Sequence, residues 1–269
     1  MDNRPLGMFD SGVGGLTILK DVLEKCPGEE IVYLGDTKRF PYGSKSRESI
    51  INLTKRGIEF LIGKGVKAVI IACGTATSQA LEEVQNCYDI PIIGIIDETV
   101  SYVRQKGYKD IGVIATTGTI RSKGWQNKLQ KNIPDAVIRD EACPLLAPMA
   151  EEGWISNEVA RLTIREYVKD LKNVECLILG CTHYPLFIPF LREELGEQTD
   201  IINTGVILSE KIRRMLSEGA LEHDAAKEIQ DGRGNYHIYL TDMEDNFIRV
   251  AGQFLQDDEI AGKIEIVET

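Results

Sequence analysis

The feature that most constrains the fold is a repeated alternation of short apolar runs with amphipathic helical segments. Residues 5–10 (PLGMFD), 31–36 (IVYLGD) and 68–73 (AVIIAC) are such runs, and each precedes a turn and then a helical pattern. Their length suits strands, and they lack alternating polar positions, which is typical of parallel strands buried on both faces. The sequence therefore predicts an α/β fold with parallel sheets.

The same order of segments occurs twice along the chain. Aligning residues 6–9 with residues 111–114 gives an offset of 105, and aligning residues 71–73 with residues 179–181 gives an offset of 108. We expect two similar, pseudo-symmetric three-layer α/β lobes with the active site in the cleft between them. Residues 1–97 with residues 207–269 should form the first lobe, and residues 98–206 the second. Helices are expected across 16–25, 47–64, 76–87 and 145–171, near 121–131 and 245–255, and from about 186.

Composition excludes several classes of partner. The net charge of −11 over 269 residues disfavours binding to nucleic acid or to anionic membranes. No apolar run approaches the roughly 20 residues that span a bilayer, and the N-terminus lacks the apolar core of a signal peptide. The six cysteines form no CxxC pair, which indicates free thiols in a reducing compartment. We expect a cytoplasmic protein without a nucleic-acid or membrane partner.

Reactive side chains gather where the predicted strands end, the edge at which open parallel sheets bind ligands. Asp10 and Cys73 follow strands of the first half, and Cys181 and His183 follow the matching strand of the second half. Each turn also opens a helix, whose unpaired N–H groups attract anions. Hydroxyl groups lie at the same strand ends, on Ser11, Thr75, Thr116, Thr119 and Thr182.

Simpler interpretations apply to each residue taken alone. A lone cysteine is more often a small core hydrophobe than a nucleophile, and Asp10 before Ser-Gly also suits a helix cap. The dinucleotide-binding motif GxGxxG is absent, because Thr17 stands where its last glycine should be. The phosphate-binding loop GxxxxGK[ST] does not occur either, so the sequence indicates no nucleotide site. Cys176, Cys181 and His183 are too few ligands for zinc and have the wrong spacing. We predict no metal and no cofactor. Four cysteines receive no role: Cys26, Cys87, Cys143 and Cys176.

Taken together, the two strand-end thiols indicate a nearly symmetric site between the lobes. Inverting a carbon centre requires a base on one face and an acid on the other. A thiol with a free pKa of about 8.5 can serve if a helix N-terminus or a cation lowers that pKa. Asp10 and His183, one from each lobe, can then assist Cys73 and Cys181 as proton relays.

Five ordered motifs resemble those of bacterial glutamate racemases, members of the aspartate/glutamate racemase superfamily. They are DSGVGGLT, GDTKRFPYGSKS, ACGTATS, ACPLLAP and LILGCTHYP, all between residues 10 and 185. The resemblance implies cofactor-independent interconversion of L- and D-glutamate, which supplies D-glutamate for peptidoglycan, and a homodimer.

The resemblance also implies a role for particular residues. Cys73 is the thiol that deprotonates D-glutamate and Cys181 the one that deprotonates L-glutamate, assisted by Asp10 and His183. Glu151 is a further catalytic acid, with its neighbour Glu152 as the alternative. The implied substrate-binding residues are Ser11, Pro41, Tyr42, Gly43, Gly74, Thr75, Thr116, Thr119 and Thr182.

One position departs from the family pattern, because Gly74 stands where an asparagine follows the first thiol. Loss of that hydrogen-bonding side chain would slow glutamate turnover by about tenfold, or mark a site for aspartate or another amino acid. On this view Gly74→Asn should raise glutamate turnover. A non-catalytic or moonlighting binding protein on the same scaffold is the alternative of another class, which the complete set of Asp10, Cys73, Cys181 and His183 disfavours.

Overall fold

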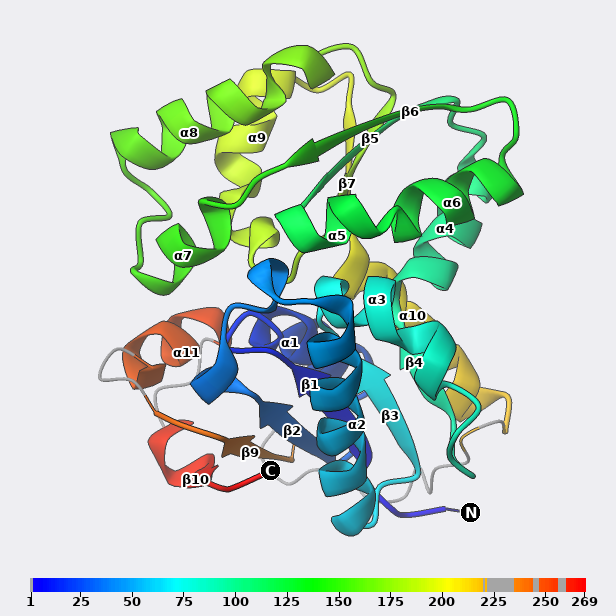
Figure 1. Ribbon diagram of the computed structural model, residues 1–269, viewed down its shortest axis with the longest axis vertical. Coiled ribbons are helices and arrows are strands. Elements are labelled where there is room, and N and C mark those ends of the chain that lie inside the picture. The colour runs from blue at the N-terminus through cyan, green and yellow to red at the C-terminus, as the bar shows by residue number, and fades with distance from the viewer. Residues whose placement is uncertain (1, 220, 222–234, 244–246, 256–259) are drawn as a thin grey trace.

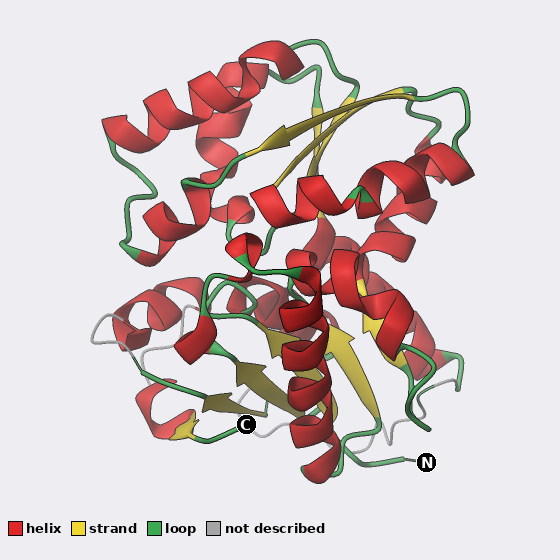
Figure 2. Cartoon of the chain, in the orientation of Figure 1, coloured by secondary structure: helices red, strands yellow, loops and turns green. Residues whose placement is uncertain are grey.

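The protein folds around two parallel sheets, seen one above the other in Figure 1 and coloured by secondary structure in Figure 2. The structure is a computed structural model that describes residues 2–219, 221, 235–243, 247–255 and 260–269. One sheet has the order β10-β9-β2-β1-β3-β4 and the other β6-β5-β7-β8. The strands are β1 (Leu6–Asp10), β2 (Ile31–Gly35), β3 (Ala68–Ile71), β4 (Ile92–Gly94), β5 (Asp110–Ala115), β6 (Val137–Ala142), β7 (Cys176–Leu179), β8 (Asp200–Asn203), β9 (Tyr236–Leu240) and β10 (Ile264–Ile266).

Helices connect the strands in the predicted alternating order. The α-helices are α1 (Leu16–Lys25), α2 (Arg47–Gly63), α3 (Gly74–Val84), α4 (Ile95–Lys106), α5 (Thr117–Ser122), α6 (Gly124–Asn132), α7 (Leu146–Glu151), α8 (Glu158–Val168), α9 (Ile188–Leu195), α10 (Thr204–Ser217) and α11 (Phe247–Leu255). Short 3-10 turns are η1 (Thr37–Arg39), η2 (Tyr42–Ser44), η3 (Lys169–Leu171), η4 (Tyr184–Phe187) and η5 (Ile260–Lys263). We call the larger sheet with its helices the first lobe, and the smaller sheet with its helices the second lobe.

Both sheets lie between two layers of helices, because side chains alternate between the faces of each strand. In β1, Met8 faces the cluster built with α1, α10 and α11, whereas Phe9 faces α2 and α3. In β7, Ile178 faces the side of α6, whereas Leu177 faces α7, α8 and α9. These buried faces explain why the strands read as unbroken apolar runs. The α/β class with two parallel sheets is therefore confirmed.

The internal repeat is visible in the strand register. Leu6 of β1 pairs with Ala68 of β3, and Ile111 of β5 pairs with Cys176 of β7, at the offsets of 105 and 108 read from the sequence. The central order β2-β1-β3-β4 corresponds to β6-β5-β7-β8. Each thiol-bearing turn consequently begins at the same place in its sheet, with Cys73 and Cys181 both two residues beyond the last paired residue.

The two lobes share a hydrophobic core. The cluster that contains Met8 and Ile70 of the first sheet also contains Val113 and Ile178 of the second. Helix α4 contacts α10 on one side and α6 on the other, and α10 packs on α1 (Figure 1). The expected boundaries near residues 97 and 206 fall within the first turns of α4 and α10. Helices therefore connect the lobes.

Several expected helix limits differ from the observed ones. The segment 121–131 is divided into α5 and α6 at Lys123, which has a left-handed backbone with φ 59°. The segment 145–171 is divided into α7 and α8, and η4 precedes α9. Residues 245 and 246 of the helix expected near 245–255 lie outside the described residues. Within the described residues, no helix is long and apolar enough to cross a membrane.

Candidate active site

Asp10 lies at the carboxyl end of β1, completely buried between the lobes. Its Oδ1 accepts a hydrogen bond from the backbone N–H of Gly12 at 3.0 Å, and its Oδ2 lies 3.5 Å from Thr182 Oγ1 of the second lobe. Burial raises the pKa of Asp10 to about 6, although the charge of His183 and the backbone N–H groups of Gly12 and Gly15 oppose the rise. Asp10 is therefore a carboxyl group that can gain or lose a proton near neutral pH.

Cys73 caps the N-terminus of α3 and carries its proton at neutral pH. Its Sγ accepts from the backbone N–H of Ala76 at 3.4 Å and lies 3.5 Å from Ser11 Oγ. Burial, and then the nearby charge of Asp10, raise the pKa of Cys73 to about 12, although Ser11 and Ala76 act in the other direction. The N–H of Ala76 at the helix N-terminus does act to lower this pKa, as such a position can, but loss of solvation outweighs it.

Cys181 lies beside a chain of proton-binding groups in the second lobe. Its Sγ is 3.8 Å from Nδ1 of His183, whose Nε2 is 2.8 Å from Oε1 of Glu151 at the end of α7. Burial lowers the pKa of His183, but the hydrogen bonds to Cys181 and Glu151 outweigh it and raise the pKa to about 10. The imidazole is thus an imidazolium at neutral pH. Glu152, the alternative acid, is exposed.

Three threonine hydroxyls join the lobes beside the thiols. Thr75 Oγ1 in α3 lies 2.9 Å from Thr116 Oγ1 and 3.1 Å from Thr119 Oγ1, and the latter two are 2.9 Å apart. Thr116 also caps α5 by accepting from the backbone N–H of Thr119. Close by, Gln79 Nε2 donates to the carbonyl of Gly118 at 3.1 Å. Three of the five hydroxyl groups predicted to hold substrate therefore meet in one place, whereas Ser11 lies against Cys73 and Thr182 beside Asp10.

The loop after β2 contributes backbone atoms and no free hydroxyl from Tyr42. The Tyr42 side chain is buried, and its hydroxyl donates to Asp36 Oδ2 at 2.6 Å, inside the first lobe. Asp36 also accepts from Thr241 Oγ1 and from Arg39 Nη1. Gly43, the next residue, lies against Thr116 of the second lobe. Pro41 is exposed at the start of this segment.

Gly74 touches the second lobe so closely that an asparagine there would meet the backbone of Gly180. A Cβ built on Gly74 would lie 2.1 Å from the carbonyl oxygen of Gly180, closer than real Cβ contacts allow. The effect of Gly74→Asn on turnover stays a prediction, and it requires the two turns to lie farther apart than they do here. An asparagine would have to displace the backbone before its amide group reached a ligand.

Four residues for which no role was predicted also lie in this region. Thr17, noted only as a break in a glycine motif, donates its hydroxyl to the carbonyl of Thr182 at 2.8 Å. The Phe40 ring covers His183 with its centroid 5.7 Å away. Gln79 and Asp36 act as described above. Only their positions close to strand ends could have drawn attention to them.

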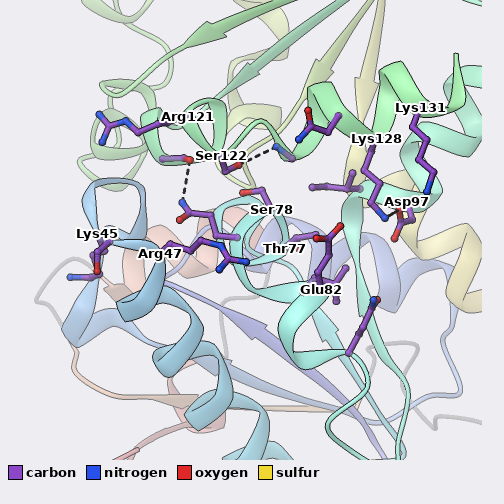
Figure 3. A pocket seen from close by; sticks show the side chains of 18 residues that line it. Lys45, Arg47, Thr77, Ser78, Glu82, Asp97, Arg121, Ser122, Lys128 and Lys131 are labelled. Carbon is purple, nitrogen blue, oxygen red and sulfur yellow. Dashed lines mark hydrogen bonds and ion pairs between the residues drawn. The ribbon is translucent and has the colours of Figure 1, made fainter. Parts of the chain in front are cut away.

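A hollow of about 500 Å³ lies farther along the junction, between α2, α3 and α4 of one side and α5 and α6 of the other (Figure 3). Its lining includes five basic side chains and two acidic ones. They are Lys45, Arg47, Arg121, Lys128, Lys131, Glu82 and Asp97. None of the predicted site residues lines it. In the described part of the chain, no three His, Cys, Asp or Glu side chains are grouped so as to hold a metal ion.

Comparisons with known proteins agree with this arrangement. The family model of the Asp/Glu/hydantoin racemases matches residues 16–211. A glutamate racemase of Geobacter metallireducens is 38% identical over 94% of this chain and 93% of its own length, and one of Lactococcus lactis subsp. cremoris is 38% identical over 95% and 93%. The crystal structure of the Francisella tularensis glutamate racemase in complex with D-glutamate superposes with a TM-score of 0.89 at 36% identity, over 100% of this chain and 98% of that chain.

A two-lobed α/β fold with a thiol at the matching strand end of each lobe defines the class of amino-acid racemases to which these relatives belong. The chain belongs to the Asp/Glu/hydantoin racemase family, and within it to the glutamate racemases.

Proposed function

We propose that this protein interconverts L- and D-glutamate without a cofactor by proton transfer between the substrate and two thiols, Cys73 and Cys181. The observation that carries the proposal is the equivalence of these two residues, each two positions past the paired part of its strand in sheets of the same order. Their neighbours differ in charge, with a carboxyl group near Cys73 and an imidazolium near Cys181.

The direction of proton transfer follows from the resemblance to glutamate racemases, in which the second-lobe thiol acts on L-glutamate. Cys181 removes the α-proton of L-glutamate, and the His183 imidazolium beside it compensates negative charge on its sulfur. The Cys73 thiol, whose pKa is raised to about 12, gives its proton to the opposite face of the α-carbon. An S–H bond forms at Cys181 and one breaks at Cys73. After the turnover Cys181 is protonated and Cys73 is a thiolate, which is the state that reacts with D-glutamate. Asp10, next to Cys73, relays protons on the first side.

Polar groups around the thiols suit an acidic amino acid. We assign the substrate's carboxylates and ammonium group to the hydroxyls of Ser11, Thr75, Thr116, Thr119 and Thr182 and to the backbone of residues 41–43 and 74. Asp10, Cys73, Cys181 and His183 are at most 7% exposed, and the Glu151 side chain is 19% exposed. Enclosure strengthens the electrostatic interactions made there, and it requires the lobes to open for substrate entry.

The cellular role follows from the product, because D-glutamate is a building block of peptidoglycan. We place the protein in the cytoplasm as a homodimer. We also place the lobe boundaries near residues 97 and 206. Sedimentation at several concentrations tests the assembly.

The test is α-proton exchange of L- and D-glutamate in D₂O, followed by NMR with optical rotation in parallel. Exchange should accompany racemisation in the wild type, and Cys73→Ala or Cys181→Ala should abolish racemisation. The same measurement with aspartate tests the alternative substrate. A folded wild type that exchanges neither amino acid would refute the proposal and favour a binding protein on this scaffold.

A further inference from the structure

The carbonyl group of Thr182, in the turn that carries the second-lobe thiol, receives no hydrogen bond from its own turn. The carbonyls on either side of it accept from the backbone N–H groups three residues further on, those of Tyr184 and Leu186, at 3.1 and 3.3 Å. The residue in the same relation to Thr182 is Pro185, which has no N–H to donate. The Thr182 carbonyl therefore needs a donor from elsewhere.

That donor comes from the other lobe. Thr17, in the first turn of α1, places its hydroxyl oxygen 2.8 Å from the carbonyl oxygen of Thr182. Among the described residues, no other hydrogen-bond donor reaches this carbonyl. Thr182 is buried, and a buried carbonyl without a donor is costly because it has given up its hydrogen bonds to water. The first lobe thus supplies a hydrogen bond that the second-lobe turn cannot make for itself.

The Thr17 hydroxyl also has an acceptor within its own lobe. The carbonyl oxygen of Gly14 lies 2.9 Å away, and it accepts from the backbone N–H of Thr17 at 3.1 Å as well. Because a hydroxyl has a single proton, the two carbonyls share it when the lobes are together. When the lobes separate, the proton can turn fully to Gly14 while water reaches Thr182. The hydrogen bond between Thr17 and Thr182 therefore belongs to the closed arrangement of the lobes.

The first-lobe loop before α1 packs closely on the same turn. A Cβ on Gly14 would lie 2.4 Å from Nδ1 of His183 and 2.5 Å from Oγ1 of Thr182. The Thr182 hydroxyl in turn lies 3.5 Å from Oδ2 of Asp10. Since Cys181 and His183 directly precede and follow Thr182, a movement of its peptide group would move both of them. The position of the thiol therefore depends on what holds the Thr182 carbonyl.

We propose that Thr17 is a positioning residue that holds the Cys181 turn in its reactive place when the lobes close. This inference rests on the function proposed above. The Thr17 hydroxyl acts through the peptide group of Thr182, and so on the sulfur that exchanges a proton with L-glutamate. Loss of one hydrogen bond to a buried carbonyl corresponds to a fall in rate of about tenfold.

Thr17→Val tests the role of the hydroxyl, because valine keeps the shape of the side chain and lacks the donor. Gly14 still accepts from the N–H of residue 17, so the variant leaves the Thr182 carbonyl without its donor. The value of kcat/KM for racemisation should fall about tenfold from either enantiomer. Thr17→Ser retains a hydroxyl and should restore most of the activity.

Thr54→Val is the matched control. Thr54 is completely buried in α2, and its hydroxyl has no hydrogen-bond partner in the part of the chain that the structure describes. The substitution therefore makes the same chemical change in another buried threonine without removing a hydrogen bond. Its kcat/KM should equal that of the wild type, and the melting temperatures of all variants are measured in parallel.

Deuterium at the α-carbon shows which side of the reaction is affected. In the proposed mechanism Cys181 breaks the bond to the α-deuteron of L-glutamate, and Cys73 breaks that of D-glutamate. Slowing the step at Cys181 makes this step limit the rate more. In Thr17→Val the isotope effect on kcat/KM should therefore rise with α-deuterated L-glutamate and fall with α-deuterated D-glutamate. A general loosening of the fold would not shift the two isotope effects in opposite directions.

The outcomes separate this inference from the proposed function. An inactive, folded wild type would refute the proposed function itself. An active wild type whose Thr17→Val variant racemises glutamate at an unchanged rate would overturn the positioning role. A slow variant whose two isotope effects change alike, or which Thr17→Ser fails to match with a higher rate, would overturn it as well, in favour of a general role in stability.

Discussion

Glu151 Oε1 lies 2.8 Å from Nε2 of His183, so a carboxylate at the end of α7 holds the imidazole whose other nitrogen faces Cys181. The contact fixes the orientation of the ring and favours its charged form. The second-lobe thiol thus has a cation beside it, although burial alone would make the histidine neutral.

Replacing Glu151 by glutamine should shift the pH dependence of the reaction. The Glu151 carboxylate contributes to the raised pKa of His183, so Glu151→Gln lowers that pKa. The alkaline limb of the kcat/KM profile should move to lower pH, with activity at pH 8 reduced about tenfold to a hundredfold. Polarimetry between pH 6 and 10 measures this, with the exposed neighbour variant Glu152→Gln as control. If the alkaline limb does not shift, Glu151 does not contribute to the raised pKa of His183.

Asp10→Asn should stabilise the protein while it inactivates the enzyme. The pKa of Asp10 is raised from 3.8 to about 6 in the folded state. As far as Asp10 is concerned, the folded state is therefore most stable below pH 3.8, where this carboxyl group is protonated in both the folded and the unfolded state. That stability is lost as the pH rises through 6 and the buried group ionises. At pH 8 the variant should have a free energy of unfolding roughly 2–3 kcal/mol above that of the wild type.

Urea denaturation at pH 4 and pH 8 checks the Asp10 prediction, and the gain should shrink toward zero at pH 4. Asp89→Asn, at an exposed position, should change neither value. A gain of equal size at both pH values would show that burial of the charge is not its cause.

Tyr42→Phe should affect stability more than substrate binding. The Tyr42 hydroxyl donates to Asp36, and its removal leaves a buried carboxylate with one donor fewer. The free energy of unfolding should fall by about 2 kcal/mol, whereas KM for glutamate should change by less than about threefold. Denaturation and steady-state kinetics measure the two effects.

Tyr88→Phe is a suitable control for Tyr42→Phe, because its hydroxyl makes only a 3.5 Å contact with Glu59 at the surface. A large rise in KM for Tyr42→Phe at unchanged stability would mean that the Tyr42 hydroxyl contacts the substrate.

The parallel sheets and the two thiol positions could be predicted from sequence because they depend on local patterns. Apolar runs define the strands, and two matched offsets define the repeat that places Cys73 and Cys181 at equivalent strand ends. The closeness of Asp10 and His183 to these thiols followed from the rule that parallel strands end at one edge.

Other properties depend on how the lobes meet, which no local pattern records. The raised pKa of Cys73 results from burial and from Asp10, which outweigh the opposite effect of the helix N-terminus that is evident from the sequence. The obstacle to a side chain at Gly74 is a carbonyl group more than a hundred residues away. The direction of the Tyr42 hydroxyl was likewise decided by a partner, Asp36, that had no evident role in the sequence.

The triangle of hydroxyls on Thr75, Thr116 and Thr119 has no intrinsic direction. Each hydroxyl has one proton to donate and lone pairs to accept, so donation can run clockwise or anticlockwise around the three oxygens with every heavy atom in place. In either sense each hydroxyl donates once and accepts once, so all three protons are used within the ring. A ligand that accepts a hydrogen bond from any of these hydroxyls must therefore take a proton out of the ring, and at Thr75 this breaks a contact between the lobes.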